Sequence, residues 1–155
     1  MSVDALFTRL NPLLRGILRS PLHRVLSGWL LLLTFTGRRS GQRFTIPVGY
    51  QVEDAEVLTV MASEAPKKQW WKNFRDSGPV EVLLRGRKRI GTARLLEPNS
   101  AEFRGCAERT LLRVPAMGRI WGIEYDGDTG LSEAQAATLA KSIAAVRIQL
   151  DPALR

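Results

Sequence analysis

The sequence predicts an α+β protein built on a closed or half-open β-barrel of about six mostly antiparallel strands, with peripheral helices. Three observations support this fold class. Six short segments show strand-type alternation or short apolar runs. Short connections join most of them, without the strand–helix alternation of a doubly wound sheet. The chain has 155 residues, 45% of them hydrophobic, which is enough for one domain with a real core.

The predicted strands are separated by turns rich in glycine or charge. A glycine- and arginine-rich turn at 37–41 follows the first strand, and the acidic pair Glu53-Asp54 follows the second. Arg85-Gly86-Arg87 forms the tip of a hairpin. The strands are expected at 29–36, 43–51, 55–61, 80–84, 88–96 and 146–150.

Three helices are expected among these strands. Pro66 opens one that runs to residue 75, and Pro98 begins a second that runs to about 112. The third begins at the capping-box residues Ser132 and Gln135 and runs to about 145. The stretch 113–130 is expected to be irregular. Cys106 falls in the second helix, where we interpret it as a packing residue.

Within a single domain overall, we expect residues 1–28 to form an N-terminal helical segment and 29–155 to form the barrel. Within 5–19, apolar side chains occupy one arc of a helix and arginines the other. Two interpretations stay open for this amphipathic helix. It packs over the barrel, or it lies on a membrane surface, where arginine-bearing amphipathic helices also bind.

The chain is basic, with a formal net charge of +8. The excess is local, because residues 1–52 hold seven arginines and a single acid, Asp4. Such a field attracts phosphate, carboxylate, acidic lipid or nucleic acid, and composition does not choose among them. Arginine favours bidentate capture of phosphate or carboxylate.

Cysteine and histidine usage excludes several classes of site. A single Cys106 excludes an internal disulfide and a cysteine metal cluster, and we expect no metal site. The lone His23 does not support a Ser-His-Asp triad. No apolar run approaches the roughly 18 residues of a membrane span. Neither is a secretory signal recognisable. We therefore expect a cytoplasmic protein, with peripheral contact at the inner face of the membrane as an extension.

The first candidate binding segment is the loop between the first two strands. Its glycines let the backbone approach a ligand closely, and its arginines and hydroxyls supply donors to an anion. The alternative is a solvated charged turn. The residues concerned are Thr36, Gly37, Arg38, Arg39, Ser40, Gly41 and Arg43.

The second candidate segment contains two adjacent tryptophans in a basic helix, Trp70 and Trp71. We expect one to pack inward and the other to offer its face to a planar ring. Asn73, three residues after Trp70, lies on the same side. The alternative is that Trp70 and Phe74 only form a core face. The basic tip 85–89 is interpreted as a solvated hairpin end or as a contact to an anion or lipid.

These segments, in this order, resemble the deazaflavin-dependent nitroreductase family, also called the quinone reductase family. The resemblance covers roughly residues 20–97. It is carried by the runs 32–41 (LLTFTGRRSG), 45–48 (TIPV), Ala62-Ser63, 70–74 (WWKNF) and 80–82 (VEV). The family's Lys-Gly-Gly stretch after Ala-Ser is replaced here by Glu64-Ala65-Pro66, and Lys67 and Lys68 are expected to supply the missing positive charge.

The resemblance implies a split β-barrel that binds the 8-hydroxy-5-deazaflavin coenzyme F-420, which carries a phosphate and an oligoglutamate tail. FMN is the less favoured cofactor. By position, the arginine-rich loop would hold the tail. The residues expected to border the deazaflavin ring are Ala62, Ser63, Trp70, Trp71 and Asn73. Pro47, Lys67 and Lys68 are further expected cofactor-binding residues.

The implied activity is hydride transfer from the reduced coenzyme to a quinone, nitro compound or other electron-poor acceptor. The coenzyme supplies the chemistry, so the sequence need not hold an acid–base pair. Tyr125, Tyr50 and Ser63 are weak candidates for a proton donor. The alternatives are a non-catalytic lipid, fatty-acid or cofactor carrier on the same barrel, an FMN-dependent enzyme, and, least favoured, a nucleic-acid binder. A homodimer stays open.

Overall fold

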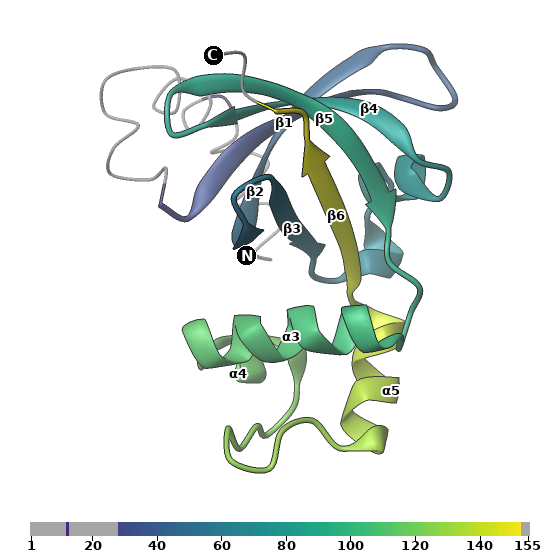
Figure 1. Ribbon diagram of the computed structural model, residues 1–155. Helices are drawn as coiled ribbons and strands as arrows, with labels where there is room; N and C mark the ends of the chain where they lie inside the picture. The colour runs from purple at the N-terminus through teal and green to yellow at the C-terminus, as the bar shows by residue number, and fades with distance from the viewer. Residues whose placement is uncertain (1–11, 13–27, 153–155) are drawn as a thin grey trace.

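The computed structural model describes residue 12 and residues 28–152. Six antiparallel strands close into a barrel in the order β1-β2-β3-β6-β5-β4, and β4 pairs back onto β1 (Figure 1). The predicted six-stranded antiparallel α+β barrel is confirmed. The expected helix at 5–19, and most of the segment 1–28, lie outside the described residues. The strands are β1 (Leu30–Thr36), β2 (Arg43–Asp54), β3 (Val57–Ala62), β4 (Gly78–Leu84), β5 (Arg87–Leu95) and β6 (Ala144–Leu150).

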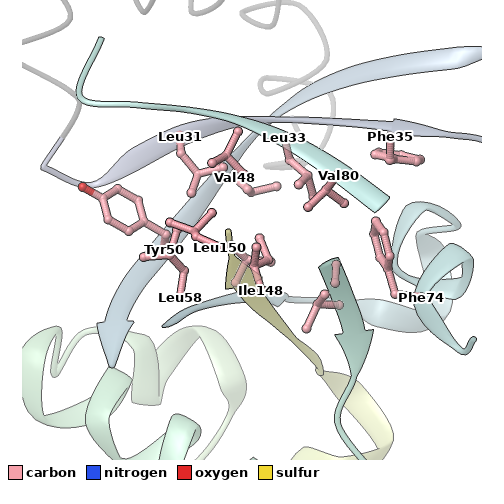
Figure 2. Close-up of a cluster of buried hydrophobic side chains, with 14 residues drawn as sticks. Leu31, Leu33, Phe35, Val48, Tyr50, Leu58, Phe74, Val80, Ile148 and Leu150 are labelled. Carbon is pink, nitrogen blue, oxygen red and sulfur yellow. The ribbon is translucent and has the colours of Figure 1, made fainter. Parts of the chain in front are cut away.

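The interior of the barrel is filled by alternate side chains of its strands. β1 contributes Leu31, Leu33 and Phe35, and Figure 2 shows Phe35 beside Phe74. Val48, Leu58, Val60, Val82 and Ile148 complete the centre of this core. In β6 the alternate residues Val146, Ile148 and Leu150 all belong to this core, as expected for a strand with one face buried.

Three helices lie together on one side of the barrel (Figure 1). They are α3 (Ala101–Arg113), α4 (Met117–Trp121) and α5 (Glu133–Ser142). A second core cluster joins them to the outer face of β3 and β6, with Met61 and Ala145 packed among Phe103, Leu111 and Leu139. Cys106 is fully buried in this cluster, as expected of a packing residue.

The helix boundaries differ from the expected ones by a few residues. α3 begins after Ser100, whose hydroxyl accepts the N–H of Phe103 at 3.2 Å. The capping box at Ser132 and Gln135 is present, but α5 ends at Ser142. It ends early because Ala144 and Ala145 already belong to β6 and pair with β3. α4 interrupts the stretch 113–130 that was expected to be irregular.

The expected helix at 66–75 is replaced by two short 3₁₀ helices, η1 (Ala65–Lys67) and η2 (Trp70–Phe74). Lys68 takes an extended conformation between them and breaks the helix. The indole N–H of Trp71 donates to the carbonyl of Ala65 at 2.9 Å, which folds η2 back onto η1. Trp70 and Trp71 therefore both pack against the core clusters, so the expectation that only one of them packs inward was wrong.

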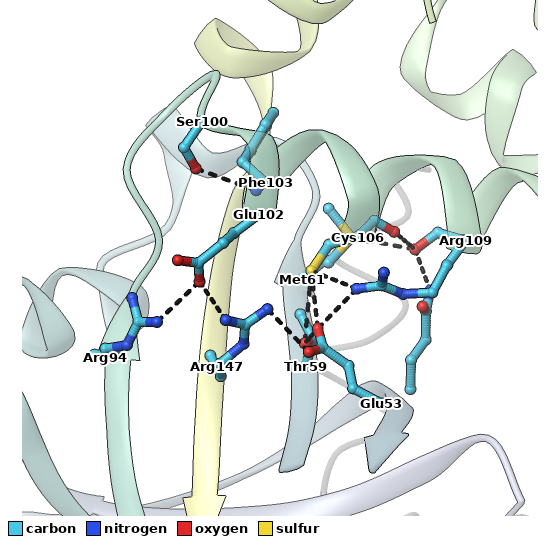
Figure 3. A network of polar contacts seen from close by, with 12 residues as sticks. Glu53, Thr59, Met61, Arg94, Ser100, Glu102, Phe103, Cys106, Arg109 and Arg147 are labelled. Carbon is cyan, nitrogen blue, oxygen red and sulfur yellow. Dashed lines mark hydrogen bonds and ion pairs between the residues drawn. The ribbon is translucent and has the colours of Figure 1, made fainter. Parts of the chain in front are cut away.

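A network of charges fastens α3 to the barrel (Figure 3). Its centre is Glu53 near the end of β2, whose two carboxylate oxygens pair with Arg109 of α3 at 2.8 Å and Arg147 of β6 at 2.9 Å. Arg147 also pairs with Glu102 of α3. The network therefore ties two strands of the barrel to both ends of one helix.

Burial raises the pKa of the Glu53 carboxyl, but hydrogen bonds from Thr59, Cys106 and Arg147 outweigh it and leave the pKa below its ordinary value. A depressed carboxyl pKa in the folded state contributes stability above the pKa of the unfolded chain. That contribution is lost as pH falls through the folded-state pKa.

We predict that Glu53→Gln lowers the free energy of unfolding at pH 7 by about 1–3 kcal/mol, since hydrogen bonds to a charged group are lost. The difference from wild type shrinks as pH falls below about 4.3, the ordinary glutamate value. Urea unfolding at pH 7 and at pH 3 measures both. The exposed Glu97→Gln is the control and should change stability little. A deficit that stays the same at both pH values would contradict the assignment.

Gly91 marks the closest approach between β5 and β6. A Cβ at this position would lie 2.3 Å from the backbone carbonyl oxygen of Gln149, and the backbone of a paired strand cannot move aside as a flexible side chain does. The strand therefore requires glycine here for space.

We predict that Gly91→Ala destabilises the barrel by at least the roughly 1–3 kcal/mol typical of overpacking. Gly78→Ala in the neighbouring strand is the matched control, because a Cβ there meets nothing within 4 Å. Comparison of the two denaturation midpoints checks the prediction. Equal midpoints would show that β5 and β6 are further apart than described.

Candidate functional site

A pocket of about 320 Å³ opens at the end of the barrel where β1 gives way to β2. The side chains of Phe35, Phe44, Ile46 and Trp70 give it apolar walls. These walls continue the barrel core, because the ring of Phe35 lies 5.8 Å from that of Phe44 and 5.5 Å from that of Phe74. A planar apolar group would meet aromatic faces in this pocket.

The rim of the pocket is polar and basic. The lining residues of the rim are Gly37, Arg38, Arg39, Ser40, Gln69 and Asn73. Arg38 and Arg39 are exposed, and neither makes an ion pair within the part of the chain that the structure describes. Two uncompensated guanidinium groups beside an apolar pocket suit a ligand with a flat apolar body and an anionic extension.

The loop 37–42 has a compact shape held by its own hydrogen bonds. The N–H of Gly37 donates to the carbonyl of Gln42 at 2.7 Å, and that of Gly41 to the carbonyl of Gly37 at 2.9 Å. Gly41 has a φ of 67°, a left-handed conformation that favours glycine. Gly37 is required for a different reason, since a Cβ there would lie 2.6 Å from Cε2 of Phe44.

These bonds change the expected role of the loop backbone. Four of its six N–H groups are used inside the protein, because Arg38 donates to Asn73 at 2.7 Å and Gln42 to the Ser40 hydroxyl at 3.2 Å. The expected anion contacts would therefore come mainly from the guanidinium groups of Arg38 and Arg39. The backbone N–H groups of Arg39 and Ser40 are the loop donors left for a ligand.

Six of the residues expected from the sequence to bind cofactor come together in this pocket. They are Gly37, Arg38, Arg39, Ser40, Trp70 and Asn73. Thr36, Gly41 and Pro47 do not line the pocket. They lie at the end of β1, in the loop and in β2, respectively. Arg43 points away, because it pairs with Glu81 of β4 at 3.0 Å.

The remaining candidates lie elsewhere in the fold. Ala62 is buried with Ala65 and Ala144. The hydroxyl of Ser63 accepts the indole N–H of Trp121 at 3.1 Å. Lys67 pairs with Glu64 at 2.7 Å, so their charges offset one another, and neither Lys67 nor Lys68 lines the pocket.

The two tyrosines proposed as proton donors also lie outside the pocket. Tyr50 is 5% exposed in the barrel core. Tyr125 packs against the cluster of the helical layer, where loss of solvation and the nearby acids Glu108 and Asp126 raise its pKa. None of the three proposed proton donors, Tyr50, Ser63 and Tyr125, therefore lines the pocket.

Sequence reasoning missed Phe35, Phe44, Ile46 and Gln69 as pocket residues. Phe35 and Phe44 could have been predicted together, because they flank a hairpin loop and lie opposite one another in the register of β1 and β2. Gln69 precedes η2, and its place depends on how η1 and η2 fold back, which leaves no local sequence signal.

Fold and pocket together define a small six-stranded barrel protein with an apolar, basic-rimmed pocket at one end. Residues 19–114 match the family model described as F420H(2)-dependent quinone reductase. The chain therefore belongs to this family, whose members are reductases dependent on the reduced deazaflavin coenzyme. The expected family and cofactor class are confirmed. No curated protein matches the chain significantly.

Three solved structures share the fold. The F420-H2 Dependent Reductase FDR-A is 17% identical, with a TM-score of 0.52 over 77% of this chain and 93% of that one. A structure described as a domain-swapped dimer is 17% identical, with a TM-score of 0.53 over 87% and 98%. The heme storage protein HutZ from Vibrio cholerae is 14% identical, with a TM-score of 0.51 over 86% and 90%. At these identities the likeness concerns the fold alone.

Proposed function

We propose that this chain binds the reduced F-420 coenzyme at the pocket of Phe35, Phe44 and Trp70, and that it reduces a quinone, nitro compound or other electron-poor acceptor there. The observation that carries the proposal is the pairing of an apolar aromatic pocket with two unpaired arginines on its rim. The deazaflavin ring suits the walls, and the phosphate and glutamate tail suits Arg38 and Arg39.

When bound, the coenzyme supplies a hydride, that is, two electrons and one proton. The acceptor gains this hydride and takes a further proton, which we propose comes from solvent. The part of the protein in this scheme is to orient ring and acceptor face to face and to keep water from the apolar walls. Trp70, held by edge contact with Phe74 at 6.5 Å, is positioned for the first of these tasks.

Three further elements belong to the proposal. We place the protein in the cytoplasm, and none of the helices described in 28–152 is long and apolar enough to cross a membrane.

Peripheral contact with the inner membrane face would bring the protein to an apolar quinone. Trp29, 55% exposed beside the start of β1 and stacked with Arg113 at 4.9 Å, suits such contact. The third element is a homodimer, in which two copies of this chain associate.

The test is titration of the purified protein with oxidised F-420, followed by quenching of coenzyme fluorescence, with FMN and a fatty acid as competitors. We predict that Arg38→Ala/Arg39→Ala weakens binding by about tenfold or more, equivalent to about 1.4 kcal/mol. The loss arises because two charge-assisted contacts to the tail disappear, and it grows at low salt.

The matched control is Arg85→Ala/Arg87→Ala at the exposed turn between β4 and β5, which changes the net charge equally. This control should bind the coenzyme within about twofold of wild type. If both double variants lose affinity equally, a long-range field and not the loop accounts for binding. If the wild-type protein binds the fatty acid and not F-420, the carrier function replaces the reductase.

A further inference from the structure

One side chain joins the two halves of the pocket. Asn73 of η2 accepts the backbone N–H of Arg38 on its Oδ1 at 2.7 Å, although the two residues are 35 positions apart in sequence. The Nδ2 of the same amide donates to the carbonyl of Trp70 at 2.8 Å. The Asn73 amide thus bridges the arginine-bearing loop and the aromatic wall.

In the described part of the chain, no other hydrogen bond joins the arginine-bearing loop to η2. The other hydrogen bonds of loop 37–42 are internal to the loop, so they fix its shape and leave its position relative to η2 to other contacts. Phe44 packs against Gly37, but this aromatic contact does not fix the orientation of the loop. A hydrogen bond does, because its strength depends on its angle.

The chemistry of the side chain suits this task. A carboxamide offers both an acceptor and donors, so one side chain can hold an N–H on one segment and a carbonyl on another. A carboxylate could only accept, and it would also place a negative charge next to Arg38 and Arg39. An alanine could do neither.

We propose that Asn73 is a positioning residue that holds the arginine loop at a fixed place relative to Trp70, and so makes the site selective for deazaflavins that carry the anionic tail. This rests on the proposed coenzyme. A ring without the tail needs only the aromatic wall, whereas the full coenzyme needs wall and loop in one arrangement. Loss of the bridge therefore affects the tailed ligand alone.

The first measurement uses the free protein and needs no ligand. Hydrogen exchange at the Arg38 amide should quicken at least tenfold in Asn73→Ala, because its acceptor is removed. The control Gln69→Ala removes another amide from the same pocket and should leave this exchange unchanged. Because the Arg38–Asn73 bond lies at the surface, both variants should keep the wild-type thermal midpoint within a few degrees.

The second measurement compares two ligands, the complete F-420 coenzyme and the deazaflavin ring with its ribityl chain but without phosphate and glutamates. In Asn73→Ala, affinity for the complete coenzyme should fall about tenfold, while affinity for the truncated ring stays within twofold of wild type. Gln69→Ala should show no such split between the two ligands.

Each contrary result has a distinct meaning. Equal weakening of both ligands would make Asn73 a contact to the ring and overturn the positioning role. Unchanged exchange at Arg38 would show that the bridge does not hold the loop in solution, which also overturns it. If wild type binds neither ligand, the proposed coenzyme is wrong, and the exchange result still decides whether Asn73 holds the loop.

Discussion

Closure of the barrel through β1 is the constraint on which the site depends. This strand has only seven residues, yet it pairs with β2 along its whole length and with β4 on its other edge. Both of its edges are therefore occupied, and the turn that leads from it to β2 stays at the open end of the barrel. The inward residue nearest that end is Phe35, so the apolar core runs without a break into the wall of the pocket. The closure of the barrel therefore places the basic turn between β1 and β2 next to the apolar opening of the pocket.

The positive charge of the chain is distributed unevenly by the same fold. On the helical side, Arg94 and Arg147 share Glu102, and Arg109 pairs with Glu53. The Arg94–Glu102 pair is exposed, and exposed pairs contribute little stability individually, commonly under about 1 kcal/mol, whereas the side chain of Glu53 is only 15% exposed. They nevertheless cancel the field of these arginines locally. Arg38 and Arg39 have no such partners in the described residues, so part of the uncompensated charge lies at the pocket.

The sequence predicted the elements whose signals are local. Strand alternation located the six strands, and the pair Ser132 and Gln135 located the start of α5, because each signal operates within a few residues. The 3₁₀ form of 65–74 was not predictable, since it depends on the indole of Trp71 reaching back to Ala65 and on packing against two clusters.

The candidate site was predicted in its loop and only partly in its wall. The arginine loop is a contiguous run with unusual composition, so it could be recognised from the sequence alone. The amide bridge between Arg38 and Asn73 spans the barrel end and leaves no trace in sequence spacing. The case of Lys67 is different and local, because it pairs with Glu64, the acid three residues earlier, and does not line the pocket.

The stretch after α3 closes the helical layer and leaves the pocket open. The indole of Trp121 donates to Ser63 at the end of β3, and Arg113 donates to the carbonyl of Gly28 at 2.9 Å while stacking on Trp29. None of the residues 113–130 lines the pocket. These contacts hold the helical layer against the start of β1 and the end of β3. The indole N–H of Trp121 and the guanidinium of Arg113 are therefore engaged in structural contacts. Under the proposed function, an acceptor in this pocket meets aromatic walls, and such walls favour flat and apolar molecules.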